Sequence, residues 1–527
     1  MKYAGLVILF VFSVASVMAQ HQKNASTYAV VVGIAGYENK GIPRLRFANR
    51  DAEVFAAYLR SNAGGNVPEE NIRLLTDSNA TTAAVYNALS WLTETSAEGD
   101  IVYFYFAGHG DMENETIHKL GFLLTYNTPR TNYINNAIRI EDLNNIANTI
   151  SVTNKARVVI ITDACHSGQL AGSNFRGNML VGEQLRTVRA KEIRITSCAS
   201  DQLSVENEAW GGGRGVFSFY LVKGLIGFAE KEKDGIVHMQ ELKAYLDSAF
   251  ANDPVLKQEG HKQTPVLQGK NEFELSVVDK TLMKEDTAMH KNIVVFNDDA
   301  ASVSNDPYDV MDLVFAAYDK KPLEQLLDFN AMESLDPHTI LMQFLEHAHN
   351  KFLREYDEVQ KNHLPGEDTS TKRLNRAASI LEGMDSLKRS IIHDKDLEEQ
   401  FQKKMMVMIH NRVQQTINLF LTGDEAELER RRYYTKESEG YGMYPAMIKT
   451  ALKFSGNDEY MNRLLNVMYY YFSGVVLRLK IPMTDKPEPL INEAYALQQK
   501  AFSLEQKAAY IYNELGVLLL YKNKLRE

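Results

Sequence analysis

The chain has 527 residues, a length that fits two large domains or three to four of average size and excludes one small module. Its formal net charge of −10 argues against a nucleic-acid partner, because neutralising phosphates requires a clustered surplus of Lys and Arg. With 45% apolar and 24% charged residues the chain can bury ordinary cores, and its two cysteines exclude a disulfide framework.

The first 19 residues have the pattern of a secretory signal peptide. Lys2 supplies a positive charge, an apolar stretch of about 12 residues follows, and residues 17–19 are those expected around a cleavage site. This stretch is shorter than the roughly 20 residues that span a bilayer. We therefore expect an exported protein that starts near Gln20, is periplasmic or extracellular, and has no membrane span after signal removal; an uncleaved anchor is the alternative.

Between residues 28 and 275, short apolar runs alternate with amphipathic helical patterns. This alternation is typical of a mostly parallel sheet with helices on both faces. The predicted strands span residues 28–34, 72–76, 101–106, 158–162 and 193–196. A helix is predicted after the first strand, because apolar residues recur at helical spacing from Ala48 to Leu59. The fold class expected here is α/β.

The composition changes after this region. Residues 276–308 are predicted to be a linker and residues 309–527 to be all-α. Within residues 480–527, the spacing of small and apolar side chains fits one unit of a 34-residue helix pair and resembles a tetratricopeptide repeat. An ordinary helical bundle is the alternative. Residues 430–432, three arginines after a run of acidic residues, are predicted to form a solvated face of mixed charge.

Two of the predicted strands are followed by reactive residues. Ala-Gly-His-Gly, with His109, follows the strand 101–106, and Asp-Ala-Cys-His-Ser-Gly, with Cys165, follows the strand 158–162. Ligands bind open α/β sheets at the carboxyl ends of the strands. A thiol becomes a nucleophilic thiolate when a nearby imidazole accepts its proton. The sequence therefore predicts that His109 and Cys165 form a catalytic pair.

On these motifs, residues 28–275 resemble the caspase family of cysteine peptidases, and within it the metacaspase-like branch. Further stretches that carry the resemblance are residues 28–34, 48–52, 196–202, 215–218 and 263–266. The resemblance implies a caspase-like three-layer sandwich in which Cys165 attacks the scissile carbonyl and His109 transfers the protons. It also implies an oxyanion hole formed by the backbone N–H groups of Gly110 and Cys165.

The resemblance also implies a substrate preference. Caspases proper hold aspartate with arginines and have Gln where this chain has Asp163. In metacaspase-like enzymes, aspartates at the positions of Asp51 and Asp163 line an acidic pocket for Arg or Lys, and Asp201 is a weaker third candidate. Ala107 stands where Ser is usual, which alters the expected depth of the pocket. The expected substrate is a polypeptide with a basic residue before the scissile bond.

No cofactor or metal is predicted to take part in the reaction. The residues with the spacing of a calcium-binding EF-hand loop, apart from a Glu at its first position, are Glu230, Glu232, Asp234, Gly235 and Glu241. A simple turn before a helix explains them equally well, so calcium activation stays open. Residues 167–192 are polar and contain four basic side chains. They are predicted to form an exposed loop and, by the resemblance, a self-processing site.

The leading interpretation is an exported cysteine endopeptidase that cleaves after Arg or Lys through an acyl-enzyme, with a helical C-terminal region that binds a protein partner. Two alternatives stay open. The chain could be a non-proteolytic scaffold that works through its helices. It could also be a thiol transpeptidase, which shares the acyl-enzyme chemistry and differs in the acceptor.

Overall fold

The structure is a computed structural model. The residues that it describes are 25–112, 120–130, 133–134, 136–164, 192–199, 202–289, 307, 310–311, 314–315, 327–361, 368–432 and 440–524. The predicted signal peptide, Cys165, Asp201 and all but the last residue of the 167–192 loop lie outside these residues.

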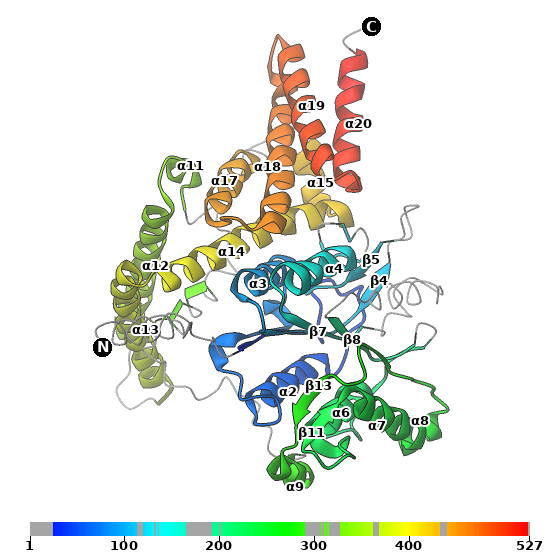
Figure 1. The fold of residues 1–527 in the computed structure, drawn as a ribbon. Coiled ribbons are helices and arrows are strands. Elements are labelled where there is room, and N and C mark those ends of the chain that lie inside the picture. The colour runs from blue at the N-terminus through cyan, green and yellow to red at the C-terminus, as the bar shows by residue number, and fades with distance from the viewer. Residues whose placement is uncertain are drawn as a thin grey trace, which may run out of the picture.

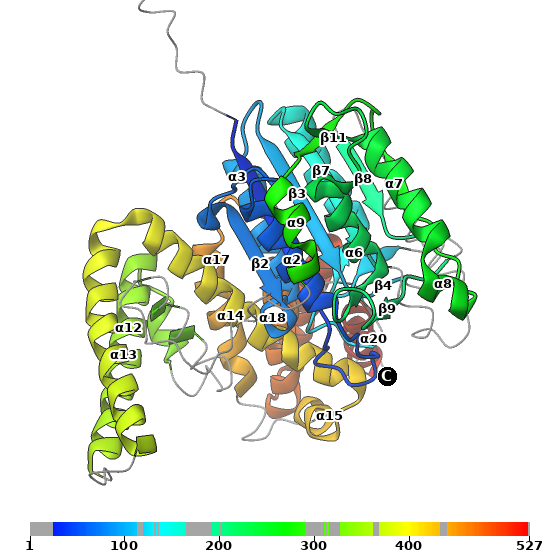
Figure 2. The ribbon, with the colours of Figure 1, turned by 90° about the horizontal axis from the view of Figure 1, so that it is seen from below.

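A six-stranded sheet forms the centre of the N-terminal half (Figures 1 and 2). In spatial order its strands are β12 (Val266–Gln268), β8 (Glu192–Thr196), β7 (Arg157–Asp163), β3 (Ile101–Ala107), β1 (Thr27–Gly33) and β2 (Ile72–Thr76). All neighbouring pairs are parallel except β12 with β8. The five predicted strands are confirmed to within one residue at each end.

Alternation along the strands divides their side chains between two cores. Val102, Phe104 and Phe106 of β3 point into one core, whereas Tyr103 and Tyr105 point into the other. The helices on the first face are α3 (Thr82–Thr95) and α4 (Ile140–Asn148). Those on the second face are α2 (Ala48–Arg60), α6 (Val216–Lys223) and α7 (Met239–Asn252). The predicted three-layer α/β sandwich is therefore confirmed.

Short strands extend the loops around the sheet. They are β4 (Gly110–Met112), β5 (Gly121–Leu123) and β6 (Ile138–Arg139) in one antiparallel sheet, β9 (Glu206–Asn207) with β10 (Arg214–Gly215), and β11 (Ile236–His238) with β13 (Glu274–Val277). β4 begins directly after His109, and β10 carries Arg214 and Gly215, so two of these small sheets adjoin the candidate site described below.

The remaining α-helices of the described chain all follow the last strand, β13, except α8. These helices are α8 (Pro254–Glu259), α9 (Lys280–Met289), α11 (Phe329–Met332), α12 (Pro337–Lys361), α13 (Asp368–His393), α14 (Lys395–Thr422), α15 (Glu425–Arg432), α17 (Tyr444–Phe454), α18 (Glu459–Lys480), α19 (Pro487–Leu504) and α20 (Ala509–Lys524). The interval 276–308, predicted to be a linker, contains the end of β13 and all of α9. Leu282 and Met283 pack against the second core, so α9 belongs to the sandwich.

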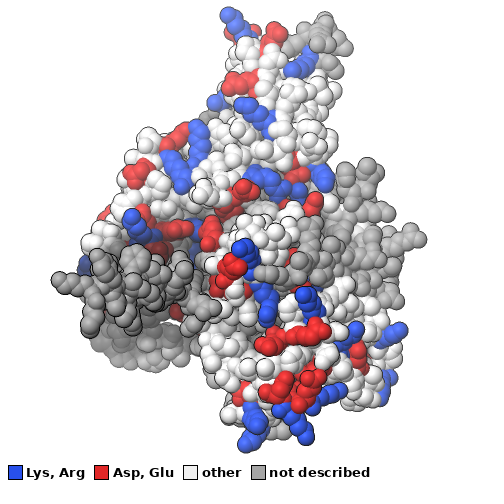
Figure 3. Space-filling model, viewed as in Figure 1, with Lys and Arg blue, Asp and Glu red and all other residues white. Residues whose placement is uncertain are grey.

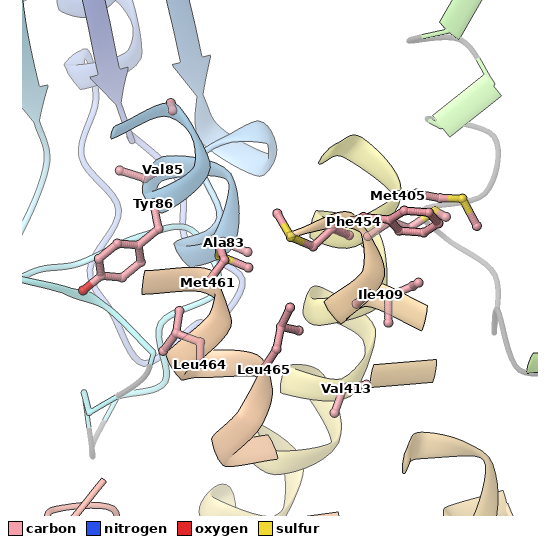
Figure 4. Packing of buried hydrophobic residues seen from close by; sticks show 14 of the residues in the cluster. Ala83, Val85, Tyr86, Met405, Ile409, Val413, Phe454, Met461, Leu464 and Leu465 are labelled. Carbon is pink, nitrogen blue, oxygen red and sulfur yellow. The ribbon is translucent and has the colours of Figure 1, made fainter. Parts of the chain in front are cut away.

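The helical region forms a fourth layer on the α3 and α4 face of the sandwich (Figure 1). Figure 4 shows the packing: α3 lies against α18 and α14, with Ala83 beside Met461 of α18. Tyr86 of α3 stacks on Tyr460 of α18. The first core continues without interruption from the sheet into these helices. The two halves of the chain therefore share one hydrophobic core.

Charged side chains reinforce this interface. Arg139 of β6 forms a buried ion pair with Glu505, and Arg463 of α18 donates to Asp142 of α4 at 2.8 Å. Tyr86 of α3 also donates its hydroxyl to Asp142, at 2.7 Å. Because these groups are largely buried and paired with each other, their geometry fixes how the helical layer sits on the sandwich.

The arginines at residues 430–432 only partly match the prediction of a solvated face. Arg432 is exposed, but Arg431 is 6% exposed and pairs with the buried carboxylate of Glu427. Arg431 also contacts the hydroxyl of Tyr471. The prediction was wrong for Arg431, because its aromatic partner lies 40 residues further along the chain on α18.

The helices α18, α19 and α20 contain the segment that resembles a tetratricopeptide unit. Its small residues Ala494, Ala501 and Ala508 are fully buried, as helix crossings require. Tyr512 and Leu519 of α20 are about half exposed, at 53% and 45%. The repeat assignment stays a prediction, since a buried small-residue seam also occurs in ordinary helical bundles.

Acidic and basic side chains are interspersed on the face shown in Figure 3. None of the helices that the structure describes combines the length and the apolarity that a membrane span requires.

We predict that Glu505→Ala lowers the free energy of unfolding by about 3 kcal/mol, because it leaves Arg139 buried without its carboxylate. Urea unfolding measures the change. Glu98→Ala is the control: Glu98 pairs with Lys155, both are exposed, and the loss should stay below about 1 kcal/mol. Equal effects of the two substitutions would contradict a stabilising role for the Glu505 contact.

Candidate active site

His109 lies at the carboxyl edge of the sheet, two residues after the end of β3. The backbone on either side of it is bonded to the end of β7: Gly108 N–H donates to the carbonyl of Asp163 at 3.1 Å, and Gly110 N–H donates to that of Ala164 at 3.0 Å. Cys165 is the next residue of the chain and lies outside the described part. The structure thus brings His109 beside the two residues that precede the predicted nucleophile.

Two groups fix the His109 ring, which is buried. Its Nε2 lies 2.8 Å from the carbonyl oxygen of Pro43. A carbonyl oxygen only accepts, so in the neutral ring Nε2 carries the proton and Nδ1 holds the lone pair. The Tyr37 hydroxyl accepts the backbone N–H of His109 at 2.8 Å, and the two rings lie 5.3 Å apart. The contact with Pro43 therefore makes Nδ1 the basic nitrogen of the neutral ring.

The expected oxyanion donor Gly110 is engaged elsewhere. Its N–H is the group that donates to the Ala164 carbonyl, as part of the backbone link between the two strand ends. An oxyanion would have to compete with that carbonyl for the same proton. The other predicted donor, the N–H of Cys165, lies outside the described residues, so the oxyanion hole stays a prediction.

Asp51 and Asp163 are brought together beside β10. A Cβ atom added to Gly215 would lie 3.0 Å from a carboxylate oxygen of each, so the absence of a side chain at Gly215 makes room for both. Both aspartates are almost fully buried. Asp201, the third candidate, lies outside the described part.

Asp51 is held by an arginine that the sequence analysis did not single out. Its Oδ1 accepts from Nε of Arg214 at 2.6 Å, and its Oδ2 accepts the N–H of Gly215 at 2.9 Å. Burial raises the pKa of Asp51 from 3.8 to about 6; Arg214 opposes this rise and the neighbouring charge of Asp163 adds to it. The predicted acidic pair is thus a cluster of two carboxylates and one guanidinium.

The family of the N-terminal half follows from the comparison of its sequence. Residues 26–275 match the sequence profile of the caspase domain. This part of the chain is a caspase domain. The match confirms the resemblance based on the histidine and cysteine motifs, and it assigns the domain to a family of cysteine peptidases.

The caspase domain also matches solved structures. They include a protein from Geobacter sulfurreducens, with 17% identity and a TM-score of 0.34, covering 48% of this chain and 100% of that one. The match to pro-sf-caspase-1 has 13% identity and a TM-score of 0.30, and it covers 49% of this chain and 96% of that one. The match to caspase-1 from Spodoptera frugiperda has 11% identity and a TM-score of 0.30, and it covers 49% of this chain and 92% of that one. No curated protein gives a significant match to the chain.

The segment with EF-hand-like spacing forms a turn before β11 and continues into the start of α7. The carboxylate of Glu241 accepts the backbone N–H groups of Lys231 at 2.6 Å, Glu232 at 3.1 Å and His238 at 2.9 Å. Glu232, Asp234 and His238 bring potential ligand atoms within 4.8 Å of one another. The turn thus has its own hydrogen bonds, and calcium activation stays a prediction.

Sequence reasoning missed three groups that shape the site: Tyr37, Pro43 and Arg214. Tyr37 and Pro43 lie in the loop before α2, more than 60 residues from the histidine that they contact. Arg214 lies 163 residues from Asp51. Pro43 acts through its carbonyl, which every residue has, so no motif could have identified it.

The shift of Asp51 has a consequence for stability. Because its pKa is higher in the folded protein than its ordinary value, the group stabilises the fold below about pH 4, and this contribution of up to roughly 3 kcal/mol is lost as pH rises through about 6. We predict that the wild type loses stability relative to Asp51→Asn between these pH values. Urea unfolding from pH 4 to 8 measures this; a constant difference would contradict the shift.

Proposed function

We propose that the protein is an exported cysteine endopeptidase that cleaves polypeptides after Arg or Lys, with Cys165 as nucleophile and His109 as base. The observation that carries this proposal is the pair of backbone bonds that joins residues 108–110 to Asp163 and Ala164. Together with the caspase domain match, it supports a thiol placed next to the lone pair on His109 Nδ1.

The reaction follows from this placement. His109 Nδ1 takes the thiol proton, and the Cys165 thiolate attacks the scissile carbonyl. The tetrahedral species collapses to a thioester as His109 gives the proton to the leaving amine. Water, deprotonated by the same imidazole, then attacks the thioester, and the acid product leaves with the thiolate restored. The Pro43 carbonyl stabilises the imidazolium that forms in each half, because it accepts from Nε2–H.

The charge of the cluster beside Gly215 supports the basic preference. Asp51 and Asp163 carry two negative charges when ionised, and Arg214 carries one positive charge that is bound to Asp51. The three groups therefore sum to −1. A substrate Arg or Lys neutralises that charge, whereas a substrate Asp adds to it in a buried setting where an unbalanced charge is costly.

Export, self-processing and partner binding belong to the same proposal. The signal-like residues 1–19 support a periplasmic or extracellular location. The basic side chains of residues 167–192 are of the kind that the acidic cluster would accept, which supports self-cleavage in that segment. The exposed Tyr512 and Leu519 of α20 support contact between the helical layer and a protein partner.

The catalytic pair is tested by substitution. We predict that Cys165→Ala abolishes peptide cleavage, that His109→Ala does nearly the same, and that the double variant loses little more, because the two groups act as a unit. Cleavage of a peptide library, read by mass spectrometry, measures this. Retained turnover in Cys165→Ala would refute the proposal. Ligated products would instead indicate a transpeptidase, and an unreactive Cys165 in wild type would favour the scaffold.

Specificity is tested separately. We predict that wild type cleaves peptides with Arg or Lys before the scissile bond at least about 100-fold faster than matched peptides with Asp. Asp163→Asn should reduce kcat/KM for the basic peptides by a similar factor, because it removes the net negative charge of the cluster. Glu98→Asn, at an exposed carboxylate, is the control and should change nothing. Efficient cleavage after Asp would refute the acidic cluster as the specificity site.

A further inference from the structure

Both groups that hold the His109 ring and its N–H belong to the loop between β1 and α2. The Tyr37 hydroxyl and the Pro43 carbonyl contact His109 from this loop, which spans residues 34–47. The imidazole has its working orientation only if this loop is in place. What fixes the loop therefore determines where the lone pair on Nδ1 points.

Asp77 fixes the beginning of this loop, and Glu206 accepts the backbone N–H groups of Arg46 and Phe47 at its end. Oδ1 of Asp77 accepts the backbone N–H groups of Ala35 at 2.8 Å and Gly36 at 2.9 Å, the two residues directly before Tyr37. Its Oδ2 accepts from Nδ2 of Asn49 on α2, at 2.9 Å. One carboxylate thus ties both the beginning of the loop and the helix that follows it to the end of β2.

The position of Asp77 suits this task. Thr76, the last residue of β2, pairs with Gly33, the last residue of β1, so the next residue after β2 reaches the start of the loop. Asp77 has a φ of 42°, in the left-handed region that Asp tolerates better than most residues. A carboxylate has two acceptor oxygens and no donor, which matches the three N–H groups that it receives.

We propose that Asp77 is a positioning residue for the catalytic histidine. It holds the loop of residues 34–47 so that Tyr37 and Pro43 orient His109 and keep its proton on Nε2. Without that restraint the ring can turn or shift its proton to Nδ1, and the base is lost. The inference rests on the proposed function, because it assigns Asp77 to the same Cys165–His109 pair.

The test exchanges the donor and the acceptor in the contact between Asn49 and Asp77. In Asp77→Asn the side-chain carbonyl can still accept from the loop, but its NH₂ faces the NH₂ of Asn49. We expect kcat for an Arg-containing peptide to fall about 10- to 100-fold with KM within about twofold, because the loss is one of orientation. Adding Asn49→Asp restores a donor–acceptor contact, while its carboxylate still accepts the N–H of Arg50, and should recover most of kcat.

Asp100→Asn is the matched control. The carboxylate of Asp100 likewise accepts two backbone N–H groups, those of Ser26 and Ala97, but it precedes β3 at the opposite edge of the sheet. Urea unfolding of each variant gives the structural cost. If Asp77→Asn and Asp100→Asn reduce kcat equally, or if Asn49→Asp fails to rescue Asp77→Asn, the positioning role is overturned.

A second readout does not depend on peptide cleavage. Iodoacetamide alkylates a thiolate, and peptide mass spectrometry separates Cys165 from Cys198, which is 1% exposed. We expect alkylation of Cys165 to slow in Asp77→Asn and not in Asp100→Asn. If wild type cleaves no peptide but shows this pattern, the proposed function fails and the positioning role stands; an unchanged alkylation rate overturns the positioning role.

If Asp77→Asn does not fold, Asn49→Ala replaces it. That substitution removes one of the three donors and leaves both bonds to the loop, so kcat should fall about 3- to 10-fold. An unchanged kcat in a folded Asn49→Ala variant, together with unchanged alkylation of Cys165, would then overturn the proposal.

Discussion

The register of three parallel strands is the constraint on which the candidate active site depends. Pairing of β1, β3 and β7 sets Gly33, Ala107 and Asp163 side by side at one edge of the sheet. The chain leaves all three strands there, and the bonds from residues 108–110 to the end of β7 extend the pairing past the sheet. A shift of one residue between β3 and β7 would exchange the two faces of a strand and separate the histidine from the residue before the cysteine.

The strands could be predicted because their signals are local, and the position of His109 at the edge of the sheet follows from them, whereas the pairing of His109 with Cys165 stays a prediction. Buried parallel strands are continuous apolar runs, and the histidine and the cysteine each lie three residues after the end of such a run. The contacts that orient the histidine are not local. A hydroxyl on Tyr37 and a backbone carbonyl on Pro43 act across more than 60 residues, and the guanidinium of Arg214 reaches its carboxylate across 163. Such contacts depend on the complete fold, which spacing along the chain does not reveal.

The division of the chain also looked sharper in the sequence than it is in the structure. A change in composition after residue 275 suggested a linker and then a separate helical part. In the fold, α9 packs back onto the caspase domain, and the helices from α14 onward complete the core that α3 and α4 begin. Arg431 shows the same effect on a smaller scale. Its neighbours in the sequence suggest an exposed side chain, but contact with Tyr471 of α18 buries it. Composition reports what a segment contains, whereas burial depends on what later segments cover.

The continuous core between the sandwich and the helices has a practical consequence for anyone who expresses the caspase domain alone. A chain that stops after α9 would expose Ala83, Tyr86 and the rest of the outward face of α3, which in the complete protein lies against α14 and α18 (Figure 4). It would also leave Arg139 and Asp142 without the charged partners that now neutralise them. Poor solubility of such a fragment would then reflect the missing helical layer. It would carry no information about the candidate active site at the carboxyl edge of the sheet.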